Sequence, residues 1–399
     1  MDHQQKTTEK IHKKARIKSQ ESVVRSSFPL DLISEILSKL PLKSVVRFRS
    51  VSKLWSSVTT DPYFINWLET RSTKKPSIAL CFKRDDKLFL FLIPQDHPNS
   101  NETHSIYSQY VDSYHMTYPK SCLFSPKVSV HGLIGCFQEA TEPMIWNPTT
   151  RKLLTLTKPE KTWEYATFFL GYDPIDAKHK VLYIRFDETI DEGCVLTLGS
   201  AQESWRRIKT KHKHCVTSYS THHVCINGVV YYKAYTDQTE SVCIIMSFDV
   251  RSQELHVIKL PWNKIGGTGI LASYEGRLAC VKVNAGHGTA LWTLMDAEKN
   301  EWSRRYFPVP VPYIDDQSLK IRFSFIGITD AGEFVYVPYT IYNSFYVLYY
   351  DTKINKFHRV EFKGIASDES RLKHGLLNSR LYNNIPAAVL NHIESLRSF

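Results

Sequence analysis

The stretch "NPTTRKL" at residues 147–153 begins with residues that favour turns and places an apolar Leu six positions after its first residue. The same arrangement recurs four more times, as "GSAQESW", "DVRSQEL", "DAEKNEW" and "DTKINKF". The five stretches start at 147, 199, 249, 296 and 351, and the sixth residue after each start is Leu153, Trp205, Leu255, Trp302 or Phe357. Turns that recur every ~50 residues indicate an internally repeated fold.

A second series of turns alternates with the first. Its members are "HGLIG" around Gly132, "HKVLY" around Lys180, "NGVVY" around Gly228, "EGRLA" around Gly276 and "AGEFV" around Gly332. Each precedes its counterpart in the first series by 15 to 21 residues, so one repeat contains two hairpins and therefore four strands. Residues 76 to about 115, with the turn "RDDK" at 84–87, form a divergent first repeat. Four strands per repeat is typical of a β-propeller blade, and the six repeats predict six blades.

Other readings of this region remain open. A β-sandwich or barrel also has recurring hairpins, though at shorter and less regular spacing, and the weak first repeat leaves five or seven blades as alternatives. Beyond residue 362 the sequence is polar until "PAAVLNHIESLRSF" at 386–399. Val389, Ile393 and Leu396 have helical spacing there, which predicts a short helix packed on the sheet within a separate segment, 363–399.

The N-terminal side has a different period. In "FPLDLISEILSKLPLKSVVRFRSVSKLWSSV" at residues 28–58, one helical face carries Leu30, Ile33, Leu37 and Leu40, and a second apolar strip carries Leu32 and Ile36. Pro41 ends this helix, "LKSVVRFRS" and "VSKLWSSV" predict two more, and Asp61-Pro62 ends the third. Three short helices are too small for an independent core, so their spare apolar strip must be covered by the rest of the chain or by a partner.

Composition and charge restrict the class of protein. The 399 residues carry a net charge of +11, and residues 1–27 hold seven Lys/Arg against three acids with little apolar content, which predicts a disordered basic tail. "HKKARIK" at 12–18 is either a nuclear import signal or an ordinary solvated run. There is no run of eighteen apolar residues and no secretory signal, so we expect an intracellular protein, cytoplasmic or nuclear, with no membrane segment. The basic excess predicts non-specific attraction to polyanions, not specific nucleic-acid binding.

Cysteines and histidines offer the main alternative chemistry. Eight cysteines, at 81, 122, 136, 194, 215, 225, 243 and 280, include no C-x-x-C pair, which indicates reduced thiols. "KHKHCVTSYSTHHVC" at 211–225 could supply zinc ligands, but its position on a predicted blade strand explains these residues by alternating burial. Neither glycine-rich run, "GGTGI" nor "AGHGTA", continues into a phosphate-binding G-K-[ST], and no G-x-S-x-G or H-E-x-x-H motif occurs. We therefore expect no metal, no cofactor and no catalytic residue.

The N-terminal segment closely resembles the F-box motif. The matching residues are Pro29, Asp31, Leu32, Glu35, Ile36, Leu37, Leu40, Pro41, Lys43, Ser44, Arg47, Phe48, Arg49, Val51, Ser52, Lys53, Trp55 and Pro62. The remainder, with "WNPTTRKLLTL", "GYDP" and "SWRRI", is similar to the F-box-associated domain of a large plant F-box family. The resemblance implies an α+β multidomain protein with a small three-helix F-box at 28–70 and an all-β, propeller-like domain at 71–362.

The resemblance also implies a function. In that family the F-box docks on a Skp-type adaptor bound to cullin and RING subunits, and the C-terminal domain holds a protein substrate for ubiquitination. The chain is then a non-catalytic subunit of a ubiquitin ligase. The family's interface, carried over by position, gives Phe28, Pro29, Ile33, Leu40, Pro41 and Leu42 as adaptor contacts and Leu37, Phe48 and Trp55 as F-box core. The alternative is a propeller enzyme or carbohydrate-binding propeller with incidental N-terminal helices. The substrate, the pathway and the binding face of the propeller are not readable from one sequence.

Overall fold

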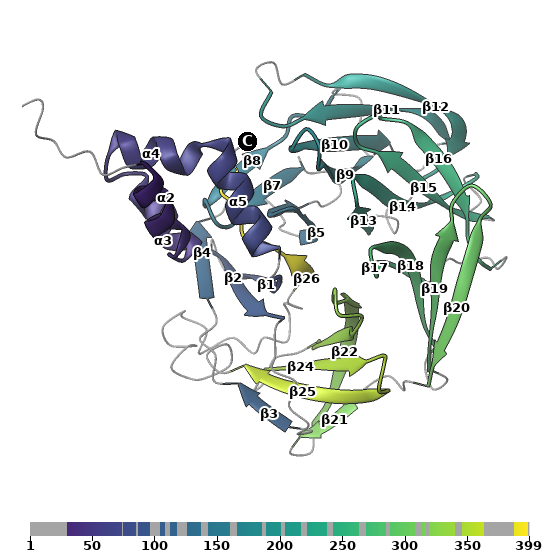
Figure 1. Cartoon of the computed structure of the whole chain (residues 1–399). Helices are drawn as coiled ribbons and strands as arrows, with labels where there is room; N and C mark the ends of the chain where they lie inside the picture. Colours follow the sequence, from purple (N-terminus) through teal and green to yellow (C-terminus); the bar gives the residue numbers. More distant parts are fainter. Residues whose placement is uncertain are drawn as a thin grey trace, which may run out of the picture. The chain divides into compact units, whose positions relative to one another are not determined.

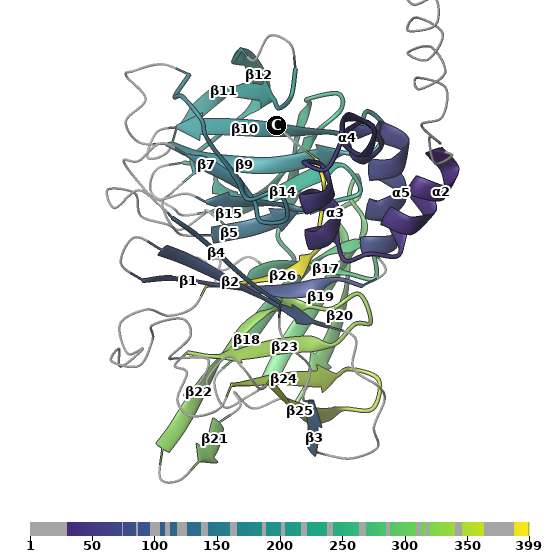
Figure 2. The ribbon, with the colours of Figure 1, turned by 90° about the vertical axis from the view of Figure 1, so that its left-hand side faces the viewer.

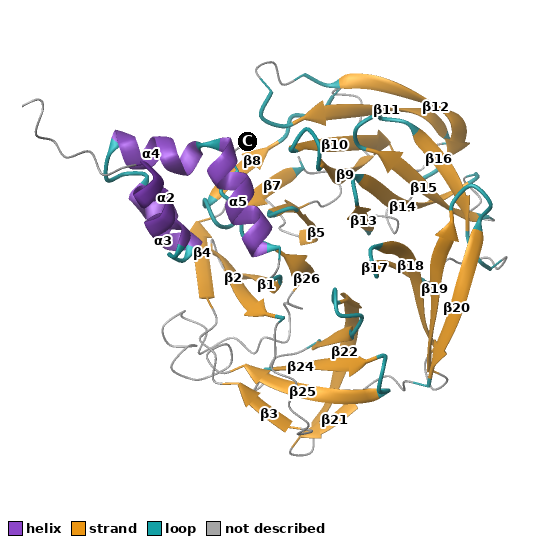
Figure 3. Ribbon diagram, viewed as in Figure 1, coloured by secondary structure: helices purple, strands orange, loops and turns teal. Residues whose placement is uncertain are grey.

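The computed structural model describes residues 30–399 except for 74, 85–86, 96–103, 108–111, 118–125, 137–142, 160–165, 186–188, 201–203, 217–221, 238–241, 263–268, 285–287, 309–312, 317–318, 340–344, 363–386 and 398. The chain divides into two compact units, Met1–Leu68 and Glu69–Phe399. The described helices all lie before residue 73, and the regular structure described after it is strand (Figure 3). The predicted order of a helical segment followed by an all-β domain is therefore confirmed.

The described part of the N-terminal helical segment contains four helices, one more than predicted. They are α2 (Leu30–Ser38), α3 (Leu42–Phe48), α4 (Lys53–Thr60) and α5 (Pro62–Ser72), the last of which crosses into the second unit. The expectation that Asp61-Pro62 only ends a helix is wrong. The Asp61 carboxylate accepts a hydrogen bond from the Phe64 amide at 3.0 Å, and Pro62 occupies the first helical position, where the missing N–H has no cost. The same dipeptide thus ends α4 and starts α5.

The second unit is a six-bladed β-propeller (Figure 1), as predicted. From the central strand outward, blade 1 contains β26 (Ala387–His392), β1 (Ser77–Arg84), β2 (Lys87–Pro94) and β4 (Asp112–Thr117), and blade 2 contains β5 (Pro126–Val130), β6 (Leu133–Cys136), β7 (Met144–Asn147) and β8 (Lys152–Thr155). In the same order, blade 3 contains β9 (Ala166–Asp173), β10 (Lys178–Arg185), β11 (Ile190–Thr197) and β12 (Arg206–His214), and blade 4 contains β13 (His223–Ile226), β14 (Val229–Tyr235), β15 (Cys243–Asp249) and β16 (Leu255–Lys259). Blade 5 contains β17 (Ile270–Tyr274), β18 (Arg277–Asn284), β19 (Gly288–Asp296) and β20 (Glu301–Phe307), and blade 6 contains β22 (Leu319–Ile328), β23 (Phe334–Pro338), β24 (Tyr346–Asp351) and β25 (Lys356–Phe362). A short strand, β21 (Tyr313–Asp316), extends the last blade through its pairing with β22.

The central strands form a closed ring. Each of β5, β9, β13, β17, β22 and β26 contacts the central strand of the next blade. Both series of turns predicted from the sequence join strands of these blades, with one error of position. Lys180 lies within β10, and the turn before it spans residues 174–177, where Ala177 takes a φ of +52°. The Asp173 carboxylate stabilises this turn by accepting hydrogen bonds from the amides of Ile175 and Asp176.

The predicted C-terminal helix is wrong. Residues 387–392 form β26, which pairs antiparallel with β1 in the register Ser77↔His392 and Cys81↔Ala387, and the chain then continues without regular structure (Figure 2). The spacing of Val389, Ile393 and Leu396 fits a helix, and all three are buried, but β1 needs a partner for the inner edge of its backbone. Strand pairing therefore overrides the local periodicity, and residues 387–392 belong to the first blade of the propeller.

A second long-range exchange links the first and last blades. β3 (His104–Tyr107) comes from the segment between β2 and β4 of blade 1, but it pairs in parallel with β25 on the outer edge of blade 6. The outer edge of blade 6 is therefore covered by a strand from elsewhere in the chain, which removes one exposed sheet edge.

The core of the propeller lies between adjacent blades. Phe169 of blade 3 stacks on Tyr232 of blade 4 with ring centroids 4.1 Å apart, inside a cluster of buried side chains from both blades. The two tryptophans at the ends of the first series of turns each bond to the preceding blade. The Trp205 indole N–H donates to the Thr157 carbonyl at 2.8 Å, and that of Trp302 donates to the Lys259 carbonyl at 3.1 Å. The repeated apolar position of the sequence thus marks contacts between neighbouring blades.

Candidate functional site

The helical segment exposes an apolar surface. On α2, Leu32 and Ile36 are 45% and 44% exposed and lie one helical turn apart, so they form one strip. Val51, Tyr63 and Trp67 are further large apolar side chains that are exposed in this segment. The adjacent strip of α2 is inside, because Ile33 and Leu37 are buried. α2 is therefore apolar on two faces, and only one of them is used within the chain.

The six residues predicted as adaptor contacts occupy different environments. Pro41 is exposed at the start of α3, Leu40 is half-buried, and Ile33 and Leu42 are buried. Phe28 and Pro29 lie outside the described residues. The exposed Leu32 and Ile36 form the second apolar strip of the sequence and are not among the six predicted contacts. Their helical spacing was the signal that could have identified them.

The three residues predicted to fill the interior of this segment are all at least partly buried. Leu37 is fully buried, and the half-buried rings of Phe48 and Trp55 pack with their centroids 4.9 Å apart. Ser52 caps α4 by accepting a hydrogen bond from the Trp55 amide at 3.2 Å, and the Arg49 guanidinium donates to the Thr59 carbonyl at 3.0 Å. These bonds fix α4, which contacts both α2 and α3.

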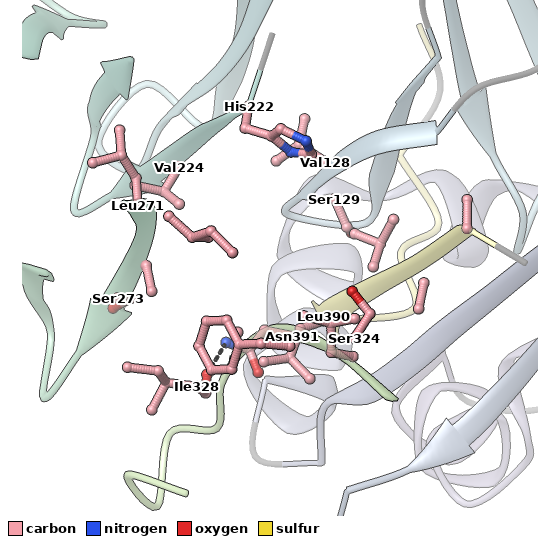
Figure 4. A pocket seen from close by; sticks show the side chains of 18 of the residues that line it. Val128, Ser129, His222, Val224, Leu271, Ser273, Ser324, Ile328, Leu390 and Asn391 are labelled. Atoms are coloured by element: carbon pink, nitrogen blue, oxygen red, sulfur yellow. Dashed lines mark hydrogen bonds between the residues drawn. The ribbon is translucent and has the colours of Figure 1, made fainter. Parts of the chain in front are cut away.

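A channel of about 520 Å³ lies at the centre of the propeller (Figure 4). Its walls come from β5, β13, β17, β22 and β26, with some residues of neighbouring strands. Apolar side chains such as Val224 and Leu271 alternate with a few polar ones, among them Ser129, Ser324 and Asn391, and no acidic side chain lines the channel among the described residues. The Asn391 amide donates to the Ile328 carbonyl at 3.4 Å. This lining supplies no carboxylate pair for acid–base catalysis.

The histidine and cysteine cluster of blades 3 and 4 is held by hydrogen bonds. His214 pairs with the Tyr232 hydroxyl at 3.0 Å, and the His223 Nε2 accepts from the Leu170 amide at 3.0 Å. Burial raises the pKa of the Cys225 thiol to about 11, so it is protonated at neutral pH. No group of three or more potential metal ligands occurs in the part of the chain that the structure describes. The interior positions of His214 and His223 agree with alternating burial on blade strands.

A buried polar cluster near the C-terminus was not predicted. Glu69, on the last turn of α5, accepts hydrogen bonds from the Ser395 hydroxyl at 2.5 Å and from the Arg397 guanidinium Nε at 2.9 Å, and the Arg397 Nη2 lies 2.8 Å from the same carboxylate oxygen. Arg397 also donates to the Ala177 carbonyl at 2.8 Å. The partners are more than 300 residues apart in sequence, and no local pattern marks them.

The stretch "NPTTRKL" takes part in the same cluster. The Asn147 amide donates to the carbonyls of Ser395 and Arg397 at 3.1 and 2.8 Å, and the Thr149 hydroxyl accepts from the Ser395 amide at 3.2 Å. Gly132, at a φ of +88°, has no room for a side chain, because a Cβ there would lie 2.3 Å from the Ser395 Cβ. The cluster therefore fastens the C-terminal residues to blade 2, which gives it a structural role.

Comparison with known proteins agrees with this architecture. Residues 26–67 match the F-box domain, and residues 77–393 match the F-box associated beta propeller domain. A protein of Arabidopsis thaliana whose name gives it as an F-box protein, At1g47790, is 47% identical over 404 residues that cover 100% of both chains. At1g47730 of the same plant, also named as an F-box protein, is 44% identical over 408 residues with the same coverage.

Among the described residues, no helix is both long and apolar enough to span a bilayer.

Proposed function

Because the chain belongs to the F-box proteins that carry an F-box-associated β-propeller domain, we propose that it is the substrate-recognition subunit of a Skp/cullin/F-box ubiquitin ligase. The F-box docks on a Skp-type adaptor and, through it, on the cullin and RING subunits. The propeller binds a protein substrate. The chain itself is not an enzyme in this proposal, and it works inside the cell, in the cytoplasm, the nucleus or both.

The observation that carries the proposal is the apolar surface of the F-box helices. Leu32 and Ile36 expose large side chains next to each other on a helix of nine residues, and an F-box of about forty residues cannot hide them in a core of its own. Contiguous exposed apolar side chains mark interaction surfaces, and their burial at an interface contributes about 25 cal/mol per Å² before association costs. In our proposal, the partner that covers this surface is the Skp-type adaptor.

The adaptor contacts proposed from the sequence can be combined with this surface. Pro41 is exposed and Leu40 is half-buried, so both can be reached by a partner without rearrangement. Ile33 and Leu42 are buried, and in our proposal they support the interface from behind. Phe28 and Pro29 complete the predicted set at the N-terminal end of the motif.

The test is co-purification of the full-length chain with a Skp-type adaptor. We expect the wild type to bind, and we expect Leu32→Asp with Ile36→Asp to lower the affinity by about a hundredfold or more, because a buried carboxylate without a partner costs at least ~3 kcal/mol. Leu40→Asp with Pro41→Ala is a second variant with the same expected result. Ile175→Asp with Ile354→Asp is the matched control, since both side chains are exposed on propeller turns.

The control should bind the adaptor like the wild type. If the wild type does not bind, the proposed role is wrong. If it binds and folded variants of both kinds keep its affinity, the adaptor uses another surface and the contact assignment is wrong. Circular dichroism of each variant confirms that the fold is kept.

A further inference from the structure

The outer strand of blade 3 is strongly basic. β12 (Arg206–His214) has the sequence "RRIKTKHKH", with five Lys or Arg residues and no acid in nine positions. The five Lys or Arg side chains and His212 are exposed, whereas Ile208 and His214 are buried. β12 lies on the rim of the propeller (Figure 1), and its only strand partner within the described residues is β11. The cations therefore face solvent along one edge of a sheet.

Part of this strand bulges out of the sheet. Lys209 pairs with Glu192, but the next pair is His214 with Ile190, so residues 210–213 stand opposite a single residue of β11. The bulge is fixed at its base, because His214 pairs with the Tyr232 hydroxyl at 3.0 Å and its other ring nitrogen lies 3.0 Å from the His212 carbonyl. The His212 amide donates to the Thr210 hydroxyl at 3.1 Å. Lys211, His212 and Lys213 are thus held out from the sheet by a buried anchor.

The surroundings do little to neutralise this charge. Arg207 lies 3.8 Å from Glu192, an exposed contact of modest strength. Arg206 bonds to the Gln253 side chain, which is neutral. The neighbouring strand β16 contacts β12 and adds the exposed side chain of Lys259, while His256 of β16 lies 3.7 Å from the exposed carboxylate of Glu254. The basic surface therefore extends over the outer strands of two blades.

Protection of a sheet edge does not require so many cations. Exposed Lys or Arg on an outer strand prevents pairing with other chains, and the outermost strands of the other blades carry two at most. β3 and β4 carry none, β8 and β16 carry one each, and β20 carries two. β12 carries five and is also blocked by its bulge. The excess needs another explanation.

We propose that the basic surface of β12 and β16 binds an acidic, extended segment of a partner protein. Its cations are exposed and spread along a line, which suits several carboxylates on a flexible chain better than one small anion in a pocket. Single-stranded nucleic acid is a weaker fit, because residues 206–214 include no Phe, Tyr or Trp, and His212 is the one exposed ring there on which a base could stack. The proposal concerns the propeller alone and does not depend on the ligase role.

The test measures fluorescence anisotropy of a labelled sixteen-residue peptide of alternating Glu and Ser with the full-length chain. We expect binding that weakens as salt rises from 50 to 300 mM, since exposed charges are screened. Lys209→Glu, Lys211→Glu and Lys213→Glu together should lower the affinity by about tenfold or more. The matched control is Lys152→Glu, Lys178→Glu and Lys356→Glu, which changes three exposed lysines of other strands and gives the same net charge. The control should keep the affinity within about twofold of the wild type.

Three results would overturn the proposal. The first is no difference between the two triple variants, which would mean that only net charge matters. The second is peptide affinity that the β12 variant does not change. The third is a (dT)₁₂ oligonucleotide that binds more tightly than the peptide and loses its binding in the same variant, which would assign the surface to nucleic acid. If the triple Glu variant does not fold, the three Gln substitutions at the same positions replace it, with Gln substitutions in the control.

Discussion

The ion pair between Glu69 and Arg397 gives the sharpest prediction for stability. The Glu69 side chain is 4% exposed and that of Arg397 is 17% exposed, so both charges are largely removed from water. The carboxylate is satisfied by the two guanidinium contacts and by the Ser395 hydroxyl. His131 lies 3.6 Å from the same carboxylate but stacks on Tyr172, and burial lowers its pKa. His131 is therefore mainly neutral and cannot replace Arg397 as the counter-charge.

The expected loss of stability comes from removing one partner of the buried ion pair, which leaves the other charge buried and unpaired. Arg397→Met keeps most of the side-chain volume but leaves a buried carboxylate without its cation, and such losses cost about 3–5 kcal/mol. Glu69→Gln leaves the guanidinium without an anion and should cost a similar amount. The double variant should lose at least ~1 kcal/mol less than the sum of the single losses, because the second change removes the charge that the first left unpaired. This non-additivity separates the ion pair from simple loss of packing.

Urea unfolding of the full-length chain, followed by circular dichroism, measures these values. Lys299→Met is the matched control, since Lys299 pairs with Asp296 at 3.6 Å in an exposed turn, with side chains 70% and 35% exposed. Its cost should be under ~1 kcal/mol. If Arg397→Met costs no more than this control, or if the single losses simply add, the charges are not coupled as the structure indicates.

Three further predictions concern the propeller. Burial lowers the pKa of His179 to about 3 and that of His392 to about 4, so below pH ~6.5 the unfolded chain binds more protons than the folded one. As the pH falls below ~6.5, the free energy of unfolding should therefore fall by up to ~1.4 kcal/mol per pH unit for each histidine. Equal urea midpoints at pH 7.5 and 5.5 would contradict this. A chain that ends at Phe307 loses blade 6 and β26 and should aggregate through its open sheet edges, whereas a soluble fragment with a cooperative melt would show that closure of the ring is not needed. Burial raises the pKa of the Cys194 and Cys225 thiols to about 11, so a disulfide reagent should label them only after unfolding, and fast labelling of the native protein would show that these thiols are accessible.

The repeated fold was predictable because its signals are local. A hairpin turn needs particular residues at fixed positions, and Gly228 and Gly276, which take positive φ, stand where the sequence placed their turns. The turn predicted at Lys180 was misplaced because residues 174–177 contain no glycine, and Ala177 adopts the left-handed conformation instead. Local signals therefore gave the number of blades, while the position of a turn depended on whether glycine marked it.

The surface of the F-box helices was only partly predictable. Periodicity identified two apolar strips on α2, but it could not show which strip faces α4, since that depends on packing between helices. The structure buries Ile33 and exposes Leu32 and Ile36. The polar cluster of Glu69 and Arg397 had no signal at all, because an isolated acid and an isolated Arg look like ordinary surface residues until the fold brings them together.

Closure of the ring explains why this polar cluster lies where it does. β26 pairs with β1 across more than 300 residues, and closing so long a loop in an unfolded chain costs ~3 kcal/mol more than closing one of ten residues. Folded blades shorten the effective loop. Among the described residues after β26, Ile393 and Leu396 are buried, and Phe399 is partly buried against the core of blades 2 and 3. Asn147, Ser395 and Arg397 add hydrogen bonds and an ion pair to this end of the chain. These contacts join the C-terminal residues to blade 2 and to Glu69 of α5, so their loss should weaken closure before it weakens any single blade.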